Sequence, residues 1–420
     1  MAIATVKTGC FPHLFEAHFA AMQGLSKGNA TTRKTALESF LKTGIPTTRH
    51  EAWKYTSLRY LNDADFKINK SCEFSVERIS EHLIKGAYKV IFIDGNLAND
   101  ISDLGELETG LHVKATTEFE VSNPELLADF DALNAAFVSS GISIEVDPES
   151  AINKTVQILH VNTAANAAGF VRNTIQVGRA SKANVVESFV SIDNAEDSLH
   201  SSFLSINVAD SASLNHVRIQ NKSHTQTDVS SISAVVDKGA VYKTFTFTTN
   251  GRVTRNNLAI RLNGEQSHTE LLGLALTKDE QVIDNFTSVD HALPHATSRQ
   301  VYANVLKDKS RCVFTGKVNV RKDAQKTAAF QLNKNLLLSS EAEVDTRPQL
   351  QIDADDVKCS HGATVGQLNQ NEIFYLQTRG IKRDVAESMI AKAFANGVLL
   401  DCPIEEARVI IESQINEYFE

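Results

Sequence analysis

The chain has 420 residues, of which 42% are apolar and 22% charged, as expected for a globular protein with a sizeable core and room for two to three domains. Its formal net charge of −9 argues against a nucleic-acid-binding or anionic-membrane-binding surface, because both need a basic excess. No apolar run reaches the roughly 18 residues of a transmembrane helix. Residues 1–22 also lack the basic segment and unbroken apolar run of a signal peptide.

The five cysteines are widely scattered and odd in number, which favours free thiols in a reducing cytoplasm over a disulfide framework. No Cys-x-x-Cys pair occurs, so a self-contained zinc or iron–sulfur site is not expected. The cysteines are Cys10, Cys72, Cys312, Cys359 and Cys402.

Residues 1–88 are predicted to form an N-terminal helical region. Apolar residues recur at helical spacing in three stretches, and Gly44 with Pro46 is predicted to end the second of them. The only tryptophan, Trp53, is predicted to anchor this region on the next layer, because a buried tryptophan usually packs. The three stretches are 11–22, 37–41 and 76–83.

Residues 89–141 are predicted to be a small α/β connecting segment. An apolar run beginning at Tyr88 indicates a buried strand that ends in a turn at Asp94-Gly95. Asn123-Pro124 then starts a helix, since asparagine is a good N-cap and proline suits the first helical position. Gly141 is predicted to end that helix.

Residues 142–366 are predicted to form an all-β core, because the period of the apolar residues changes from that of a helix to that of a strand. Short runs rich in Val, Ile, Thr and Phe recur at a spacing of about 8–15 residues. Corners with Asn or Gly and few hairpin signals favour an irregular parallel β-helix. A β-sandwich remains the alternative, because the sequence has no strict repeat period.

Residues 367–420 return to the helical period and are predicted to form a C-terminal helical domain. Gly397 is predicted to close a first apolar stripe, and Pro403 to start a second helix with acidic residues in its first turn. Such a helix pair either caps the open end of a β-helix or docks into a partner, and the pattern does not distinguish the two. The first stripe consists of Ile381, Val385, Met389 and Phe394, and the second of Ile404, Ala407, Ile411, Ile415 and Tyr418.

The commonest catalytic motifs are missing from the sequence, which has no P-loop, no Gly-x-Ser-x-Gly and no His-Glu-x-x-His. We therefore expect no P-loop ATP site in this chain. His291 and His295, on either side of Pro294, are predicted to be hydrogen-bonded turn or edge residues rather than ligands. Cys312 lies in an apolar strand and is predicted to be an inert buried thiol.

Cys359 and His361 are the strongest candidates for a metal site. In an extended segment, side chains two positions apart leave the same face, so this thiol and this imidazole point together. The apolar residues before them have even numbers, whereas the pair is odd-numbered, so a corner or bulge is expected at Asp355-Asp356. Two ligands cannot hold iron or zinc alone, and a metal site here needs groups from another chain.

Several segments of the sequence resemble the SufB/SufD family of iron–sulfur cluster assembly proteins. The most specific are residues 290–302 and the run Lys358-Cys359-Ser360-His361-Gly362-Ala363-Thr364-Val365-Gly366. The resemblance covers nearly the full chain. Other matching segments are 49–56, 132–135, 314–318, 324–327, 336–339, 346–350, 374–376 and 379–381.

The resemblance implies a right-handed parallel β-helix with helical regions at both ends. It also implies a non-catalytic scaffold subunit in a cytoplasmic complex with a SufB-like subunit and a SufC-like ATPase, which residues 367–420 would contact. In this family the nascent cluster is thought to form where two β-helices meet, which implies His361, with Cys359 beside it, as interface ligands of iron or the cluster. The resemblance leaves open whether reduced flavin binds the assembled complex and whether the chain alone forms a homodimer.

Two departures from the SufB pattern indicate the SufD branch of the family. SufB carries a Cys-Asp-Ser-Leu-Leu segment whose cysteine receives sulfur, whereas this chain has Asn333-Lys334-Asn335-Leu336-Leu337. SufB has His-Glu-Ala-Thr where this chain has His361-Gly362-Ala363-Thr364. The chain is therefore not expected to build a cluster alone.

Two other functions are weighed against this one. The chain could be a purely structural adaptor that stabilises the complex while the cluster is built on SufB alone. A carbohydrate-active β-helix enzyme is permitted by the fold, but the missing signal peptide and the scarcity of exposed aromatic residues on the strands argue against it.

Overall fold

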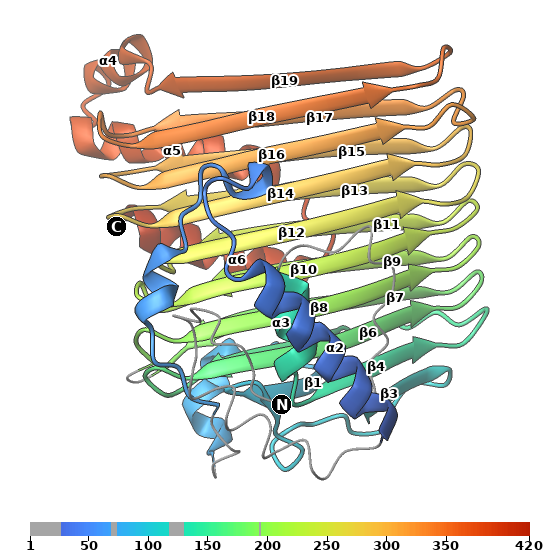
Figure 1. Ribbon diagram of the computed structural model, residues 1–420. Coiled ribbons are helices and arrows are strands. Elements are labelled where there is room, and N and C mark those ends of the chain that lie inside the picture. Colours follow the sequence, from blue (N-terminus) through green and yellow to red (C-terminus); the bar gives the residue numbers. More distant parts are fainter. Residues whose placement is uncertain (1–26, 69–73, 117–129, 193–194) are drawn as a thin grey trace.

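The computed structural model of the chain describes residues 27–68, 74–116, 130–192 and 195–420. Two long sheets of mainly parallel strands face each other, and the chain passes from one to the other at each corner (Figure 1). The result is a β-solenoid of about eight turns with two strands in each turn. The expected parallel β-helix is confirmed. The sandwich alternative is wrong, because from residue 141 onward consecutive strands lie in opposite sheets rather than side by side.

We name each sheet after its last strand. The β19 sheet contains β1 (Tyr88–Ile93), β2 (Asn96–Leu97), β5 (Val156–Asn162), β7 (Lys182–Ser191), β9 (Ser213–Asn221), β11 (Val241–Thr249), β13 (His268–Thr277), β15 (Thr297–Leu306), β17 (Ala328–Leu337) and β19 (Lys358–Gln367). The β18 sheet contains β3 (Leu111–Thr116), β4 (Gly141–Val146), β6 (Ala168–Val177), β8 (Leu199–Val208), β10 (Thr227–Val236), β12 (Val253–Leu262), β14 (Val282–His291), β16 (Arg311–Val320) and β18 (Glu343–Ile352).

The length of one turn varies along the solenoid. Lys182 in β7 pairs with Ser213 in β9, 31 residues later, whereas Thr227 in β10 pairs with Val253 in β12, 26 residues later. The strands stay in register because the corners absorb the difference. This variation explains why the sequence has no strict repeat period.

The corners that lead from the β18 sheet into the β19 sheet share one backbone device. A residue with positive φ donates its N–H to a carbonyl of the next turn, as Ser211 does to Lys238 and His295 does to Gln325. A left-handed conformation costs a non-glycine residue about 1–2 kcal/mol, and the ladder of hydrogen bonds between turns offsets that cost. His295 thus occupies a corner, as predicted.

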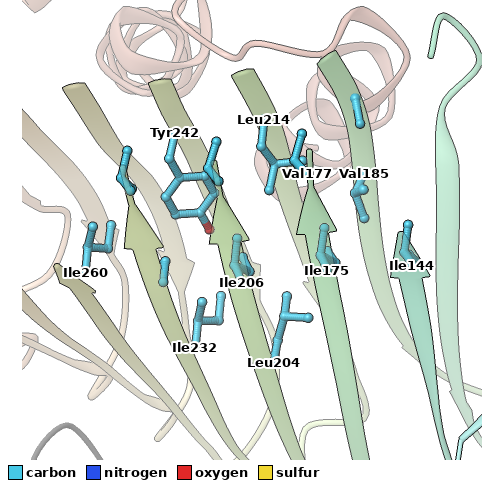
Figure 2. Packing of buried hydrophobic residues seen from close by; sticks show 14 of the residues in the cluster. Ile144, Ile175, Val177, Val185, Leu204, Ile206, Leu214, Ile232, Tyr242 and Ile260 are labelled. Carbon is cyan, nitrogen blue, oxygen red and sulfur yellow. The ribbon is translucent and has the colours of Figure 1, made fainter. Parts of the chain in front are cut away.

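The space between the two sheets, which we call the lumen, is filled by inward-pointing side chains. Ile175, Ile206 and Ile260 belong to one row across adjacent strands (Figure 2). Figure 2 shows this row facing side chains of the opposite sheet such as Tyr242 and Leu214. Each such buried side chain contributes about 1.5–3 kcal/mol, so the first turns are held by apolar packing.

The outer face of the β18 sheet is covered by the N-terminal elements (Figure 1). Trp53, which is 1% exposed, packs with its ring 5.7 Å from that of Phe130, and both lie against residues of the sheet such as Phe170. The predicted anchor is therefore confirmed. The elements of this region are α2 (Lys27–Thr43), α3 (Phe130–Phe137) and the 3-10 helices η2 (Glu51–Trp53) and η3 (Arg59–Asp63). A further 3-10 helix, η4 (Val76–His82), packs instead on the β19 sheet, where Ile79 clusters with Ile91 and Leu159.

The predictions for the first 141 residues hold in part. α2 ends before Gly44, which has positive φ, and Asp94-Gly95 forms the turn after β1, both as predicted. Gly141 does not end a helix, because α3 ends at Phe137 and Gly141 already belongs to β4. The predicted helix at 11–22 and the helix start at Asn123-Pro124 lie outside the described residues.

The C-terminal helices α4 (Gln370–Thr378), α5 (Arg383–Leu399) and α6 (Glu405–Phe419) follow the last strand. α5 and α6 pack on the outer face of the β19 sheet, where Ala391 and Ile411 belong to one cluster with Phe245 and Leu274. The option that this pair caps the open end of the solenoid is therefore wrong.

The apolar stripe predicted before Gly397 is only in part the buried face of α5, where Phe394 packs against the same cluster. Val385 and Met389 are 47% and 46% exposed, because α5 approaches the sheet through small residues such as Ala391 and Ala395. Gly397 does not end the helix either, since α5 continues to Leu399. The predicted face of α6 is buried at Ile404, Ala407, Ile411 and Ile415.

Candidate functional site

Among the described residues, no strand pairs with the outer edge of either sheet at the last turn of the solenoid. β18 and β19 are the final strands of their sheets, and β19 runs along the top of the solenoid in Figure 1. Side chains that point into the lumen are covered by the next turn elsewhere, but here Val365 is 52% and Ile352 is 40% exposed. An unpaired edge beside exposed apolar side chains is a template for another strand.

The register of β19 shows which of its backbone groups are free. The Lys358 N–H donates to the Thr327 carbonyl of the preceding turn at 2.9 Å. In a parallel strand, every second residue forms its backbone hydrogen bonds with the same neighbouring strand. The even-numbered residues of β19 therefore form theirs with β17. The N–H groups that point to the open edge belong to Cys359, His361, Ala363 and Val365.

Cys359 and His361 leave the same face of β19, as predicted. β18 ends at Ile352 and β19 begins at Lys358, so the expected corner between them is confirmed, and an ion pair of Asp356 with Lys326 ties it to the preceding corner. In β17, Cys359 pairs with Ala329 and His361 with Gln331. Both candidate ligands thus stand at the mouth of the lumen.

The two candidate ligands differ in their access to solvent. His361 is exposed, whereas Cys359 is half-buried and packs in a small cluster with Val318 and Ala329. Burial raises the pKa of the Cys359 thiol, and the backbone of Ala329 lowers it by less. The thiol therefore keeps its proton at neutral pH. Because the thiolate is the metal-binding form, the exposed imidazole of His361 is the stronger candidate of the two.

Within the described ranges, no group of three or more His, Cys, Asp and Glu side chains could hold a metal ion. Cys359 and His361 are thus an incomplete set in this part of the chain. A tetrahedral site would need at least two further ligands.

A column of polar side chains lies in the lumen directly behind His361. Gln300 in β15 accepts a hydrogen bond from Thr287 at 2.8 Å and another from the Gln331 amide nitrogen at 3.3 Å. The Gln331 side-chain oxygen is buried and has no hydrogen-bond partner. Sequence analysis missed this column, because its members lie in three strands that come together only through the register of the solenoid.

The other residues singled out in the sequence are structural. His291 is buried, its Nε2 lies 2.9 Å from the Ser298 hydroxyl, and burial lowers its pKa to about 4. Burial raises the pKa of the Cys312 thiol to about 12, so this thiol is inert at neutral pH. The prediction for Cys312 is confirmed. His291 is hydrogen-bonded as predicted, but it is the last residue of β14, with paired strands on both sides, and not a turn or edge residue.

A buried ionic network that sequence analysis did not identify lies deeper in the lumen. The Glu187 carboxylate accepts from Arg218 Nε at 3.0 Å and lies 3.2 Å from His216 Nε2. Burial acts to raise the pKa of Glu187, but Arg218 and the histidine contacts outweigh it and hold the pKa well below the usual range. Charged residues at inward positions of otherwise apolar strands were the signal for this network.

The second part of the network centres on Asp228, which pairs with Lys222 and lies 3.2 Å from His200 Nδ1. Burial holds the pKa of His200 well below its usual value, and likewise that of Lys222. Each buried charge has a partner of opposite sign, so the network organises the fold far from β19.

The N-terminal segment reaches the last turn along the outer face of the β18 sheet. Asp284 pairs with Arg255 and accepts from the Thr56 hydroxyl, and the Arg255 guanidinium lies 4.5 Å from the centre of the Trp53 ring. Further along, Arg347 of β18 donates to the Glu51 carboxylate at 2.8 Å. Residues 51–56 therefore connect the N-terminal region to the strand that borders the open end.

Two family models match successive parts of the chain. Residues 10–158 match the SufBD protein N-terminal region, and residues 160–394 match the SufBD core domain of SUF system FeS cluster assembly. The chain belongs to the SufB/SufD family. It is 33% identical to the iron–sulfur cluster assembly protein SufD of Escherichia coli over 390 residues, which are 91% of this chain and 90% of the relative.

Other relatives support the same assignment. The chain is 23% identical to the iron–sulfur cluster assembly protein SufD of Bacillus subtilis, over 88% of this chain and 90% of that protein. It is 27% identical to a SufBD family protein of Synechocystis, over 86% and 84%. The chain is thus a SufD-type member of the family, with a role in iron–sulfur cluster assembly. No helix in the described ranges is long and apolar enough to cross a membrane.

Proposed function

We propose that this SufD-type chain is a non-catalytic scaffold subunit that joins a SufB-like subunit through the open turn of its solenoid. In the cytoplasm, it lends His361, with Cys359 beside it, to iron or the nascent cluster. The iron and the cluster are cargo of the assembly process. The observation that carries the proposal is that an unpaired strand edge and an incomplete pair of metal ligands coincide on β19.

Three features of the last turn support pairing with another chain. Alternate N–H groups of β19 point to the open edge, where a partner strand would accept from them. Val365 and Ile352 would lose their solvent exposure of 52% and 40% on pairing. The same contact would bring ligands of the partner to the mouth of the lumen, where His361 lies.

The C-terminal helices support a second contact, with a SufC-like ATPase. α5 and α6 are held against the β19 sheet, while α4 presents Phe374 and Tyr375 with 67% and 57% exposure. On α5, Val385 and Met389 are exposed as well. Exposed aromatic and methionine side chains on adjacent helices are typical of a docking face, and residues 367–420 would form it.

The ligand role is tested by the substitution His361→Ala in the assembled complex. The side chain is exposed, so assembly should be spared. Iron and acid-labile sulfide recovered with the complex under anaerobic conditions should fall. Unchanged iron and sulfide would contradict the ligand assignment.

The alternative is a purely structural adaptor, in which the cluster is built on the SufB-like subunit alone. The partial burial of Cys359 and the raised pKa of its thiol favour this alternative for Cys359, but not for His361. If the double variant Cys359→Ala/His361→Ala assembled clusters normally while deletion of residues 367–420 abolished assembly, the adaptor would be the correct function.

A further inference from the structure

We propose that Gln331 is a positioning residue for His361, whose ring N–H donates to the Gln331 side-chain oxygen while the other ring nitrogen binds iron. This inference rests on the proposed function, because it concerns the same ligand. Gln331 does not touch the metal in this arrangement. It fixes the tautomer and the orientation of the imidazole.

The register places the two residues side by side. His361 and Gln331 are paired positions of β19 and β17, and in parallel strands paired residues send their side chains to the same face. Within the described chain, the Gln331 oxygen is the buried polar atom on the strand next to His361 that lacks a hydrogen-bond partner. A buried carbonyl oxygen normally has a donor, and the His361 ring can supply one.

The hydrogen bonds of Gln331 also decide which end of its amide is free. Its nitrogen donates to the Gln300 oxygen at 3.3 Å, and that oxygen is held in turn by the Thr287 hydroxyl at 2.8 Å. The end that remains for His361 is therefore the oxygen, which can only accept. An acceptor selects the histidine tautomer that carries its proton on the near nitrogen, and this leaves the far nitrogen with a lone pair for a metal.

The opposite sheet leaves room for this arrangement at Gly316 in β16. A Cβ atom at Gly316 would lie 2.1 Å from the Gln331 amide nitrogen and 2.8 Å from its Cδ. Any larger residue at 316 would therefore push the Gln331 carboxamide out of its place. The φ of Gly316 is not in the left-handed region, so backbone strain is not what requires glycine there.

The test compares the affinity for Fe²⁺ of complexes assembled with variant chains, measured by anaerobic equilibrium dialysis. Gln331→Leu removes the acceptor at similar volume and should weaken Fe²⁺ binding about 10-fold to 100-fold, as loss of a partner of a metal-binding histidine typically does. Gln331→Glu keeps an acceptor and should retain binding. Gly316→Ala displaces the carboxamide without removing it and should weaken binding in the same direction.

The matched control is Asn333→Leu. Asn333 is a buried amide of the same strand and face, but it pairs with Ala363 instead of His361. This variant loses a hydrogen bond of 3.2 Å to the Tyr302 carbonyl and another of 2.7 Å from the Asn335 amide, and it should bind Fe²⁺ as the wild type does. A second readout is the ¹⁵N chemical shift of the His361 ring, which reports the tautomer and should change in Gln331→Leu but not in Asn333→Leu.

The outcomes separate this inference from the function on which it rests. If His361→Ala weakens Fe²⁺ binding and Gln331→Leu does not, the positioning role is wrong and the ligand role stands. Equal weakening by Gln331→Leu and Asn333→Leu would mean a general effect on the fold and would overturn the inference. Wild-type Fe²⁺ affinity in His361→Ala would contradict the proposed function itself. If Gln331→Leu does not fold, Gly316→Ala alone decides.

Discussion

The substitution Ala363→Pro tests whether the open edge of β19 binds the partner subunit. Ala363 is exposed in the middle of β19, and its N–H points away from β17. Proline therefore removes a free donor at this position, and it is tolerated in an edge strand whose N–H faces solvent. The chain itself should stay folded, with a melting temperature within a few degrees of the wild type.

The expected loss of affinity follows from the hydrogen bonds of a paired edge. One bond to a partner strand is worth about 0.5–1.5 kcal/mol net, and the proline ring also holds the facing carbonyl away. Together these effects should cost about 2 kcal/mol, which corresponds to roughly a 30-fold increase in Kd. The same reasoning makes Thr364→Pro a matched control. The N–H of Thr364 donates to β17, so the substitution breaks the hydrogen bonding between these two strands. It should lower the free energy of unfolding by about 3 kcal/mol.

The assay is a titration of immobilised SufB-like subunit with each variant, with thermal melting of the free chains in parallel. We expect Ala363→Pro to weaken binding at an unchanged melting temperature, and Thr364→Pro to lower the melting temperature. Wild-type affinity of a folded Ala363→Pro variant would refute pairing through this edge.

Three further predictions concern the interior, the N-terminal anchor and the C-terminal helices. Burial lowers the pKa of His160, and lowers that of His200 further, so below about pH 6.5 the unfolded chain takes up protons first and stability falls. From pH 7.5 to 5.5 each histidine whose pKa stays below that range, such as His200 or His291, should cost about 1.4 kcal/mol, or about 1–2 °C in melting temperature, and His200→Gln should remove its share; a pH-independent melting temperature would contradict it. Trp53→Ala removes a side chain that is 1% exposed and leaves a cavity, so it should lower the free energy of unfolding, measured by urea denaturation, by about 3–5 kcal/mol. A loss below about 1 kcal/mol would mean that the anchor is dispensable. The double variant Phe374→Ala/Tyr375→Ala should leave the melting temperature unchanged, because both side chains are more than half exposed. It should weaken binding of the SufC-like ATPase by at least about tenfold. Unchanged binding would exclude α4 from the docking face.

The sequence predicts the all-β core well, because every strand alternates between the lumen and an outer face. It does not decide between solenoid and sandwich, since the same alternation arises in both. The deciding contacts join residues 26–32 positions apart, such as Thr227 with Val253, and the unequal turns remove any fixed period that would reveal them. Without the family resemblance, only the backbone register identifies the fold.

The C-terminal helices show a second feature that the sequence does not predict, namely which face of a helix is buried. The large apolar residues of the segment after Ile381 predict a buried stripe, yet Val385 and Met389 are exposed and alanines face the sheet. Close approach of a helix to a flat sheet favours small side chains, and the larger ones are left for a partner. The pattern of hydrophobic residues thus shows that a helix forms, but not which side it packs.

The sequence predicts one part of the candidate site, the pair of Cys359 and His361, but not the other part, Gln331. That Cys359 and His361 share a face follows from their spacing of two in a strand. Gln331 lies 30 residues before His361 and becomes its neighbour only through the pairing of β17 with β19. The free oxygen of Gln331 is also a property of packing, because it depends on Gln300, Thr287 and Gly316.

The most direct test of the central claim is to detect nitrogen coordination from this chain to the assembled iron–sulfur species. A complex is prepared anaerobically with ¹⁵N-histidine only in this chain and reduced to a paramagnetic state, and electron–nuclear hyperfine spectra are recorded. We predict the coupling of a directly bound ¹⁵N nucleus that disappears in His361→Ala and persists in a His224→Ala control, which changes an exposed corner remote from β19 in the fold. No ¹⁵N coupling in the wild type, or the same coupling in His361→Ala, would contradict the claim that His361 forms one wall of a shared site.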